Sequence, residues 1–234
     1  MNILVKSKTI LIYLSLTVLL LFMIQSTFLL IEYSNVNIGS PYWDYLRFLF
    51  DFGAENNIPT IFSFICWVIC ALYLLLLSIN ERKNGGFSKY WMGLAVLFGY
   101  FSIDEFLSIH ENISPNLQLY LNTSGVFYFA WIIPYGILIL ILLIVYYRVF
   151  LSIPTRIKKL FMISATIFIG GSIGIEMSEA YFFSLYGQTD LCYILLSYLE
   201  ELFEMLGLVC FIYSLNCYLT LKSVNITLSF KDNK

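Results

Sequence analysis

The residues of this chain with the greatest capacity for chemistry are carboxylates set in apolar stretches. The segment FSIDEFLSIHE, residues 101–111, contains three of them and the only histidine, and the segments EMSE at 176–179 and LEELFE at 199–204 add five more. A carboxylate at the centre of a membrane helix costs about 2.5–3.5 kcal/mol, so such residues usually have a function. The candidate ligands are Asp104, Glu105, His110, Glu111, Glu176, Glu179, Glu200, Glu201 and Glu204.

Basic residues are missing from the same parts of the chain. No Lys or Arg occurs between Lys89 and Arg148, or between Lys159 and Lys222. The carboxylates therefore have no cationic side chain within their own helical hairpin, and protonation, a bound cation or a water-filled vestibule must neutralise them. Carboxylate oxygens suit hard divalent cations such as Ca²⁺, Mg²⁺ or Mn²⁺, while a proton relay would use the same residues.

The composition indicates which class of protein must position these residues. Of the 234 residues, 60% are hydrophobic, 18% are aromatic and only 12% are charged. A soluble domain needs about twice that charged fraction, so the chain is expected to be an integral membrane protein with the lipid bilayer around it. The net charge of −2 argues against a nucleic-acid partner.

Six apolar runs are each long enough to cross a membrane as a helix, which takes about 20 residues. The expected fold is therefore all-α: a polytopic bundle of six transmembrane helices in a single domain, residues 1–220, followed by a short cytoplasmic tail, residues 221–234. The predicted spans cover residues 9–31, 58–79, 90–110, 126–148, 160–181 and 192–220.

The distribution of Lys and Arg predicts the orientation of the bundle. Basic residues precede the first span, follow the sixth, and lie between the second and third and between the fourth and fifth spans. The alternate loops, 32–57, 111–125 and 182–191, contain only Arg47. Because cytoplasmic loops are enriched in Lys and Arg, both termini are expected to face the cytoplasm.

This topology places the carboxylates at similar depth. Asp104 lies about 20 Å along the third span, Glu176 about 24 Å along the fifth, and Glu200 about 12 Å from the outer end of the sixth. At about 100° per residue, three acidic stripes result. They consist of Asp104, Ser108 and Glu111; of Ser172, Glu176 and Glu179; and of Ser197, Glu200, Glu201 and Glu204. We expect them to meet in the outer half of the membrane, with His110 joining only if its helix ends there.

Some features of the outer segments have more than one interpretation. Glu111, Glu179 and Asp190 could be ordinary charges at the outer surface, and Glu55 could face inward or be solvated. The aromatic segment PYWDYLRFLFDFG, residues 41–53, suits a short helix at the outer interface or a simple aromatic belt.

Two glycines suggest a close contact between helices. Gly170 and Gly174 in the segment GGSIG have the small-xxx-small spacing that lets two membrane helices approach closely. We therefore predict that another helix packs against these two residues.

Three motifs, SIDEFLSIHE, ENNIPTIFS and LEELFEMLG, together resemble a group of bacterial multi-pass inner-membrane proteins with no known activity. The resemblance spans most of the chain and implies a location in the cell membrane. It assigns no role to any residue. The residues that it marks as part of the group's pattern are Glu55, Asp104, Glu105, His110, Glu111, Glu200, Glu201 and Glu204.

Three classes of function fit these observations. The leading hypothesis is a cavity that binds a cation or protons for transport or gating. The second is a metal-dependent membrane enzyme, in which the ExxE pairs Glu176/Glu179 and Glu201/Glu204 bind one or two metal ions, although such bundles normally use ExxH ligands. The third is a sensor or assembly subunit that docks a basic partner segment.

Other partners and cofactors are little constrained by the sequence. No Walker A or GxGxxG motif indicates a nucleotide cofactor, and a divalent metal ion is the only cofactor that the residues suggest. A homo-oligomer is compatible with this composition.

Overall fold

The computed structural model describes residues 7–34, 40–83 and 86–222, and all regular secondary structure in these ranges is helical. The prediction of an all-α protein is confirmed. Most of the predicted tail, residues 221–234, lies outside the described residues. The helices are α1 (Ser7–Tyr33), α2 (Pro41–Phe50), α3 (Ile58–Lys83), α4 (Ser88–Leu107), α5 (Ile109–Leu121), η1 (Gly125–Phe127), α6 (Ile132–Ser152), α7 (Thr155–Ile169), η2 (Gly170–Ile175), α8 (Glu176–Tyr186) and α9 (Leu191–Leu221).

Several of these helices have the length and apolar composition of membrane spans. Five qualify by themselves, namely α1, α3, α6, α9 and the continuous segment α7–η2–α8. A sixth is obtained if α4 and α5, which meet at an angle of 81°, are counted as one broken span. The class of protein expected from the composition, a multi-pass membrane protein, agrees with these apolar helices.

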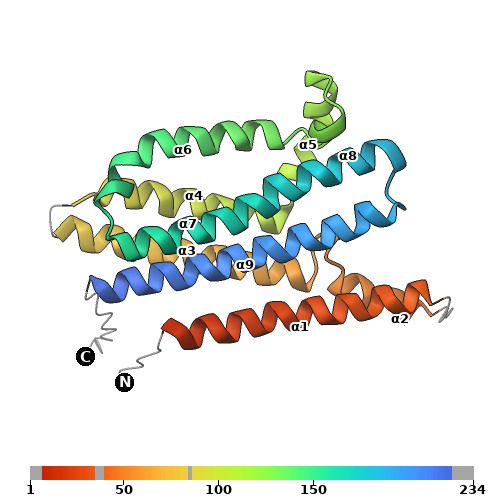
Figure 1. Ribbon diagram of the computed structural model, residues 1–234, viewed down its shortest axis with the longest axis horizontal. Coiled ribbons are helices and arrows are strands. Elements are labelled where there is room, and N and C mark those ends of the chain that lie inside the picture. Colours follow the sequence, from red (N-terminus) through yellow and green to blue (C-terminus); the bar gives the residue numbers. More distant parts are fainter. Residues whose placement is uncertain (1–6, 35–39, 84–85, 223–234) are drawn as a thin grey trace, which may run out of the picture.

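The long helices lie side by side, with α9 contacting α1, α3, α7, η2 and α8 (Figure 1). The start of α1 and the end of α9 lie at the same end of the bundle, where the hydroxyl of Ser7 donates a hydrogen bond to Asn216. The short helices α2 and α5 lie at the opposite end (Figure 1). The bundle therefore has two distinct ends, which we call the terminal end and the loop end.

Apolar side chains fill the space between α3, α4, α7 and α9. Leu74, Leu77, Ile212 and Leu215 are completely buried there, and the ring of Trp67 contacts three phenylalanine rings. Because lipid tails are as apolar as these side chains, close van der Waals packing, and not removal from water, is what holds such helices together in a membrane. This core holds α9 in register with α3 and α7, the helices on either side of it.

A left-handed residue ends α4 before the third predicted span would end. Ser108 has φ 49° and ψ 44°, and α5 departs from it at a sharp angle. The freed carbonyls are capped by the side-chain amide of Asn112, which donates to the Ser108 oxygen at 2.7 Å and to the Leu107 oxygen at 3.2 Å. The regular helical rotation expected from Asp104 to Glu111 therefore stops at Leu107.

A π-helix, η2, interrupts the segment from α7 to α8 and changes the glycine packing. No atom of another helix lies within 4 Å of a Cβ built on Gly170 or Gly174, so the contact predicted for these two residues is wrong. Gly171 makes the contact instead, because a Cβ there would lie 2.8 Å from Phe203 Cβ and 3.1 Å from the Glu200 carbonyl oxygen of α9. The wider π-turn brings a different glycine to the interface.

Candidate functional site

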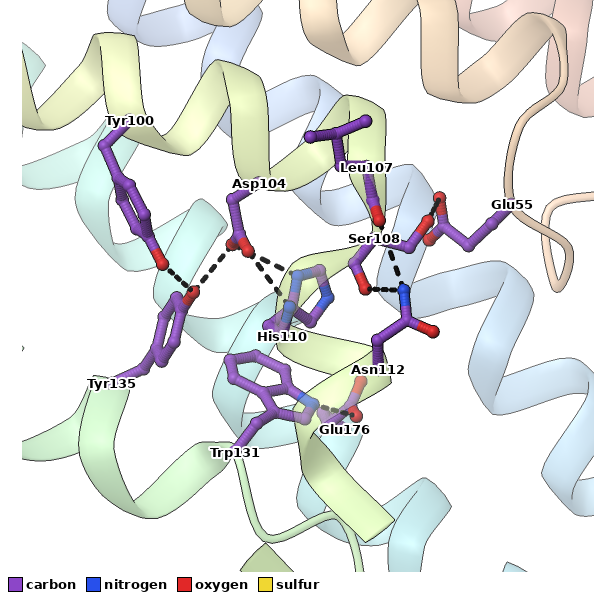
Figure 2. A network of polar contacts seen from close by, with 10 residues as sticks. All are labelled: Glu55, Tyr100, Asp104, Leu107, Ser108, His110, Asn112, Trp131, Tyr135 and Glu176. Atoms are coloured by element: carbon purple, nitrogen blue, oxygen red, sulfur yellow. Dashed lines mark hydrogen bonds and ion pairs between the residues drawn. The ribbon is translucent and has the colours of Figure 1, made fainter. Parts of the chain in front are cut away.

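Asp104 is the centre of a polar network at the loop end (Figure 2). It is 4% exposed, and its Oδ1 accepts a hydrogen bond from the backbone N–H of His110 at 3.0 Å. Its Oδ2 lies 3.2 Å from His110 Nδ1 and accepts a hydrogen bond of 2.7 Å from the Tyr135 hydroxyl, which is 3.3 Å from the Tyr100 hydroxyl. The carboxylate is thus held by two helices, α5 and α6, that do not contain it.

The break at Ser108 makes the Asp104–His110 pair possible. In a continuous helix these two residues would be separated by about 240° of rotation and could not meet. The sequence indicated that His110 would join the acidic face only if its helix ended nearby. The structure ends α4 at Leu107 and brings the imidazole back to Asp104.

Trp131, immediately before α6, links this network to α8. Its indole Nε1–H donates a hydrogen bond of 3.0 Å to Glu176 Oε1, and its ring lies 4.8 Å from that of His110 and 5.1 Å from that of Tyr135 (Figure 2). A charge-assisted bond of this kind fixes the orientation of the Glu176 carboxylate.

Glu176, Glu179 and Glu200 form a cluster of three carboxylates between α8 and α9. One oxygen from each lies within 4.8 Å of the others. Glu179 is only 6% exposed, and its Oε2 is buried with no hydrogen-bond partner in the described part of the chain. These three side chains have the donor type and spacing that could hold a metal ion.

Glu201 follows Glu200 directly, about 100° further around α9, and contacts α3. Its Oε1 accepts a hydrogen bond of 3.4 Å from Ser63 of α3. Glu105 of α4 is close to Glu201 and Glu204, and Glu204 contacts Glu200. The carboxylates of α9 therefore join α8 on one side to α3 and α4 on the other.

Glu55, in the loop between α2 and α3, faces inward. Its Oε2 accepts hydrogen bonds from Ser108 at 3.2 Å and from Thr60 at 3.4 Å. Burial, together with the charge of Glu111, raises the pKa of Glu55 from 4.5 to about 7, although His110 and the two hydroxyls act in the other direction. The question left open by the sequence is thereby answered: Glu55 belongs to the acidic group and not to the solvated loop surface.

Two other acidic residues of the loop end have different surroundings: Glu111 lies at the edge of this group, and Asp190 caps a helix. Glu111 is exposed at the start of α5. Asp190 caps α9, because its Oδ1 accepts a hydrogen bond of 3.1 Å from the Tyr193 N–H. An N-cap needs no further function. Glu179, the third residue with a surface alternative, is buried instead.

Cationic side chains do not neutralise the acidic group in the described ranges. The Lys and Arg ion pairs found there are Arg47–Glu32 at 2.7 Å and Lys222–Glu81 at 2.8 Å, and neither involves these carboxylates. The absence of basic residues from the two hairpins of the sequence thus persists in the folded structure.

Residues 11–218 match the model of a protein family described as "Domain of unknown function (DUF8692)". The chain belongs to this family. No curated protein and no solved structure matches it. The prediction that the chain belongs to an uncharacterised family is therefore confirmed, and the site must be interpreted from its own geometry.

Sequence reasoning missed the aromatic members of the site. Tyr100, Trp131 and Tyr135 belong to apolar runs in which aromatic residues are frequent, so no local pattern distinguishes them. One signal was available in the sequence. A tyrosine hydroxyl or an indole N–H within an apolar run needs a hydrogen-bond partner, and the run itself contains few polar residues. The acidic stripes of the neighbouring predicted spans contain such partners, namely Asp104 for Tyr135 and Glu176 for Trp131.

Proposed function

We propose that this chain is a six-span membrane protein of the bacterial inner membrane, with both termini in the cytoplasm and a carboxylate-lined cavity in the outer half of the membrane. The cavity binds a cation or protons and serves transport or gating. The spans are the five long helices and the broken pair α4–α5. The orientation rests on the Lys and Arg residues of alternate loops.

The observation that carries this proposal is the gathering of carboxylates from four segments with no Lys or Arg partner among the described residues and with one histidine, His110, beside Asp104. Asp104 and Glu105 come from α4, Glu176 and Glu179 from α8, Glu200, Glu201 and Glu204 from α9, and Glu55 from the loop before α3. If all were ionised and unpaired, their cost would exceed the usual stability of about 5–15 kcal/mol. A mobile counter-charge, either a cation or protons, solves this problem.

Transport or gating is favoured because two spans are irregular beside the carboxylates. The bend at Ser108 lies between Asp104 and His110 in the sequence and brings their side chains together, and the π-helix η2 ends directly before Glu176. Broken helices at membrane depth commonly form ion sites, since they direct backbone and side-chain groups into a cavity and can change conformation. A uniformly regular bundle would provide neither property.

The proposal can be tested with purified protein in liposomes. Cation and proton flux are measured with ion-sensitive dyes for the wild type and for the double variant E200Q/E204Q. The double variant should lose the flux, whereas Glu111→Gln, which removes an exposed carboxylate of the same region, should retain it. Unchanged flux in E200Q/E204Q, or no flux of any tested cation in the wild type, would contradict the proposal.

A further inference from the structure

The three-carboxylate cluster differs from the rest of the cavity in what its oxygens contact. We propose, on the basis of the function proposed above, that Glu176, Glu179 and Glu200 form a specific site for a divalent cation of the size of Ca²⁺. The other carboxylates of the cavity form its surroundings and do not ligate this ion.

The spacing of the oxygens fits such an ion. Because the three atoms lie within 4.8 Å of one another, a single point lies within about 2.8 Å of all of them, near the roughly 2.3–2.6 Å of Ca²⁺–oxygen bonds. Mg²⁺ requires about 2.0–2.1 Å and rigid octahedral geometry, so it would need larger movements of the side chains. The site should therefore prefer Ca²⁺ or Mn²⁺ to Mg²⁺.

An independent observation, the buried and unpartnered oxygen of Glu179, points to a ligand. Oε2 of this side chain has neither solvent contact nor a hydrogen-bond partner among the described residues. An unsatisfied buried oxygen costs about 1–3 kcal/mol, and more when it is charged. A cation between α8 and α9 would satisfy it, whereas no side chain of the fold does.

Three of the other carboxylates of the acidic group already accept hydrogen bonds from hydroxyl or backbone N–H groups. Asp104 accepts hydrogen bonds from the His110 N–H and the Tyr135 hydroxyl, Glu201 accepts one from Ser63, and Glu55 accepts two from hydroxyls. Within the proposed site, only Glu176 has a neutral donor, the indole of Trp131, which uses one oxygen and orients the carboxylate. The cluster thus has the largest unused capacity to bind a cation.

The π-helix and Gly171 explain why the ligands meet. A π-turn contains one residue more than an α-turn, so it rotates the following residues by about 100° compared with a continuous α-helix. Glu176 and Glu179 follow η2 directly and face α9. Gly171 lets the two backbones approach, since a Cβ there would lie 3.1 Å from the Glu200 oxygen and 3.2 Å from the Glu204 nitrogen.

Titration of Ca²⁺, Mn²⁺ and Mg²⁺ into the purified full-length protein in detergent, followed by calorimetry, tests this inference. The wild type should bind one Ca²⁺ or Mn²⁺ more tightly than Mg²⁺. Glu179→Gln and Glu176→Gln should each weaken Ca²⁺ binding at least about tenfold, a loss typical of disturbed metal sites. The matched variants Glu201→Gln, in the same cavity, and Glu111→Gln, at its edge, should change it less than about threefold.

Thermal unfolding with and without Ca²⁺ distinguishes a variant that has lost ligands from one that binds weakly because it is partly unfolded. Saturating Ca²⁺ should raise the thermal unfolding midpoint of the wild type and of Glu201→Gln, because a ligand that binds only the folded state stabilises it. At the same Ca²⁺ concentration it should raise the midpoint of Glu179→Gln by less. Glu200→Asp keeps the negative charge but shortens the side chain, which moves the carboxylate oxygens away from the proposed ion. The affinity of this variant for Ca²⁺ should therefore also fall.

The results separate this inference from the function on which it rests. If E200Q/E204Q abolishes flux but the wild type binds no divalent cation, or if Glu201→Gln weakens binding as much as Glu179→Gln, the divalent site is overturned and the cavity function stands. If Ca²⁺ binds through Glu179 while flux is absent from the wild type, the site stands and the transport function fails.

Discussion

At the terminal end of the bundle a buried carboxylate has a lysine partner, whereas the eight carboxylates gathered at the loop end have no Lys or Arg partner among the described residues and share a single imidazole, that of His110. Glu81, 6% exposed near the end of α3, lies 2.8 Å from the Lys222 ammonium after α9. One turn away, the hydroxyl of Ser78 donates to the Ser88 carbonyl and that of Ser88 donates to the Ser78 carbonyl, both at 2.9 Å. These contacts satisfy their own polar groups and join α3 to α4 and α9.

The loop end contains more buried charge and fewer donors. Its hydrogen bonds come from hydroxyl, indole and backbone groups and from the single imidazole of His110. These donors orient the carboxylates without balancing their charge. The difference teaches that the same residue type has a structural role at one end, where Lys222 supplies the counter-ion, whereas at the other end the described residues supply no Lys or Arg for it, which is the basis of the proposed function.

The largest change in stability is expected from a substitution in the contact between α9 and η2. Gly171→Ala should lower the free energy of unfolding by about 2–3 kcal/mol, because its Cβ would lie 2.8 Å from Phe203 Cβ and close to the α9 backbone. Chemical denaturation in detergent measures this change. Gly174→Ala, where the Cβ meets open space, is the matched control and should be neutral or slightly stabilising. Equal losses in both variants would show that the loop end is not closely packed.

Glu55 should make the stability of the loop end depend on pH. Its pKa is about 7 in the folded chain and near 4.5 when unfolded, so the protonated form is favoured by folding. Its contribution is complete below pH 4.5 and is lost as the pH rises through 7.

Thermal unfolding of the wild type and of Glu55→Gln at pH 5 and pH 8 isolates this contribution. The wild type should lose more stability than the variant over this interval. Glu55 faces Glu105, Glu111, Glu201, Glu204 and His110, so part of the dependence will remain in Glu55→Gln. An identical dependence in both proteins would exclude Glu55 as a titrating group.

Replacing one glutamate by glutamine should change the stability in opposite directions at the two ends of the bundle. Glu81→Gln should destabilise the fold by about 1–2 kcal/mol because it breaks a partly buried ion pair with Lys222. Glu179→Gln should stabilise it by about 1 kcal/mol with a chelator present, at a pH high enough for all three carboxylates to ionise, because it removes a like charge from the cluster with Glu176 and Glu200. Denaturation midpoints in detergent compare the two variants. If both changed stability in the same direction, the contrast between the ends would be wrong.

The smallest effect concerns the hydroxyl that supports Asp104. Tyr135→Phe removes a hydrogen bond of 2.7 Å to this carboxylate and should cost about 1 kcal/mol. Tyr100→Phe removes only the outer 3.3 Å contact and should cost less. Unfolding free energies of the two single variants and the double variant form a cycle that measures their coupling. A larger loss of stability in Tyr100→Phe than in Tyr135→Phe would show that Tyr135 is not the main hydroxyl partner of Asp104.

The sequence by itself determined the helical class, the apolar spans and the segments that contain the acidic stripes. These properties depend on local composition and on the helical period, which neighbouring structure changes little. It also determined that neither hairpin contains a Lys or Arg that could pair with Asp104, Glu176 or Glu200.

Only the tertiary structure decided how these side chains meet. The left-handed conformation of Ser108 turns His110 back to Asp104, and the π-turn of η2 rotates Glu176 and Glu179 and replaces Gly170 by Gly171 at the interface with α9. Each is a break in helical regularity that local propensity does not favour and that packing between helices must stabilise. A constant helical rotation of about 100° per residue predicts which carboxylates share a helix face. It does not predict the breaks at Ser108 and η2 that bring these faces together.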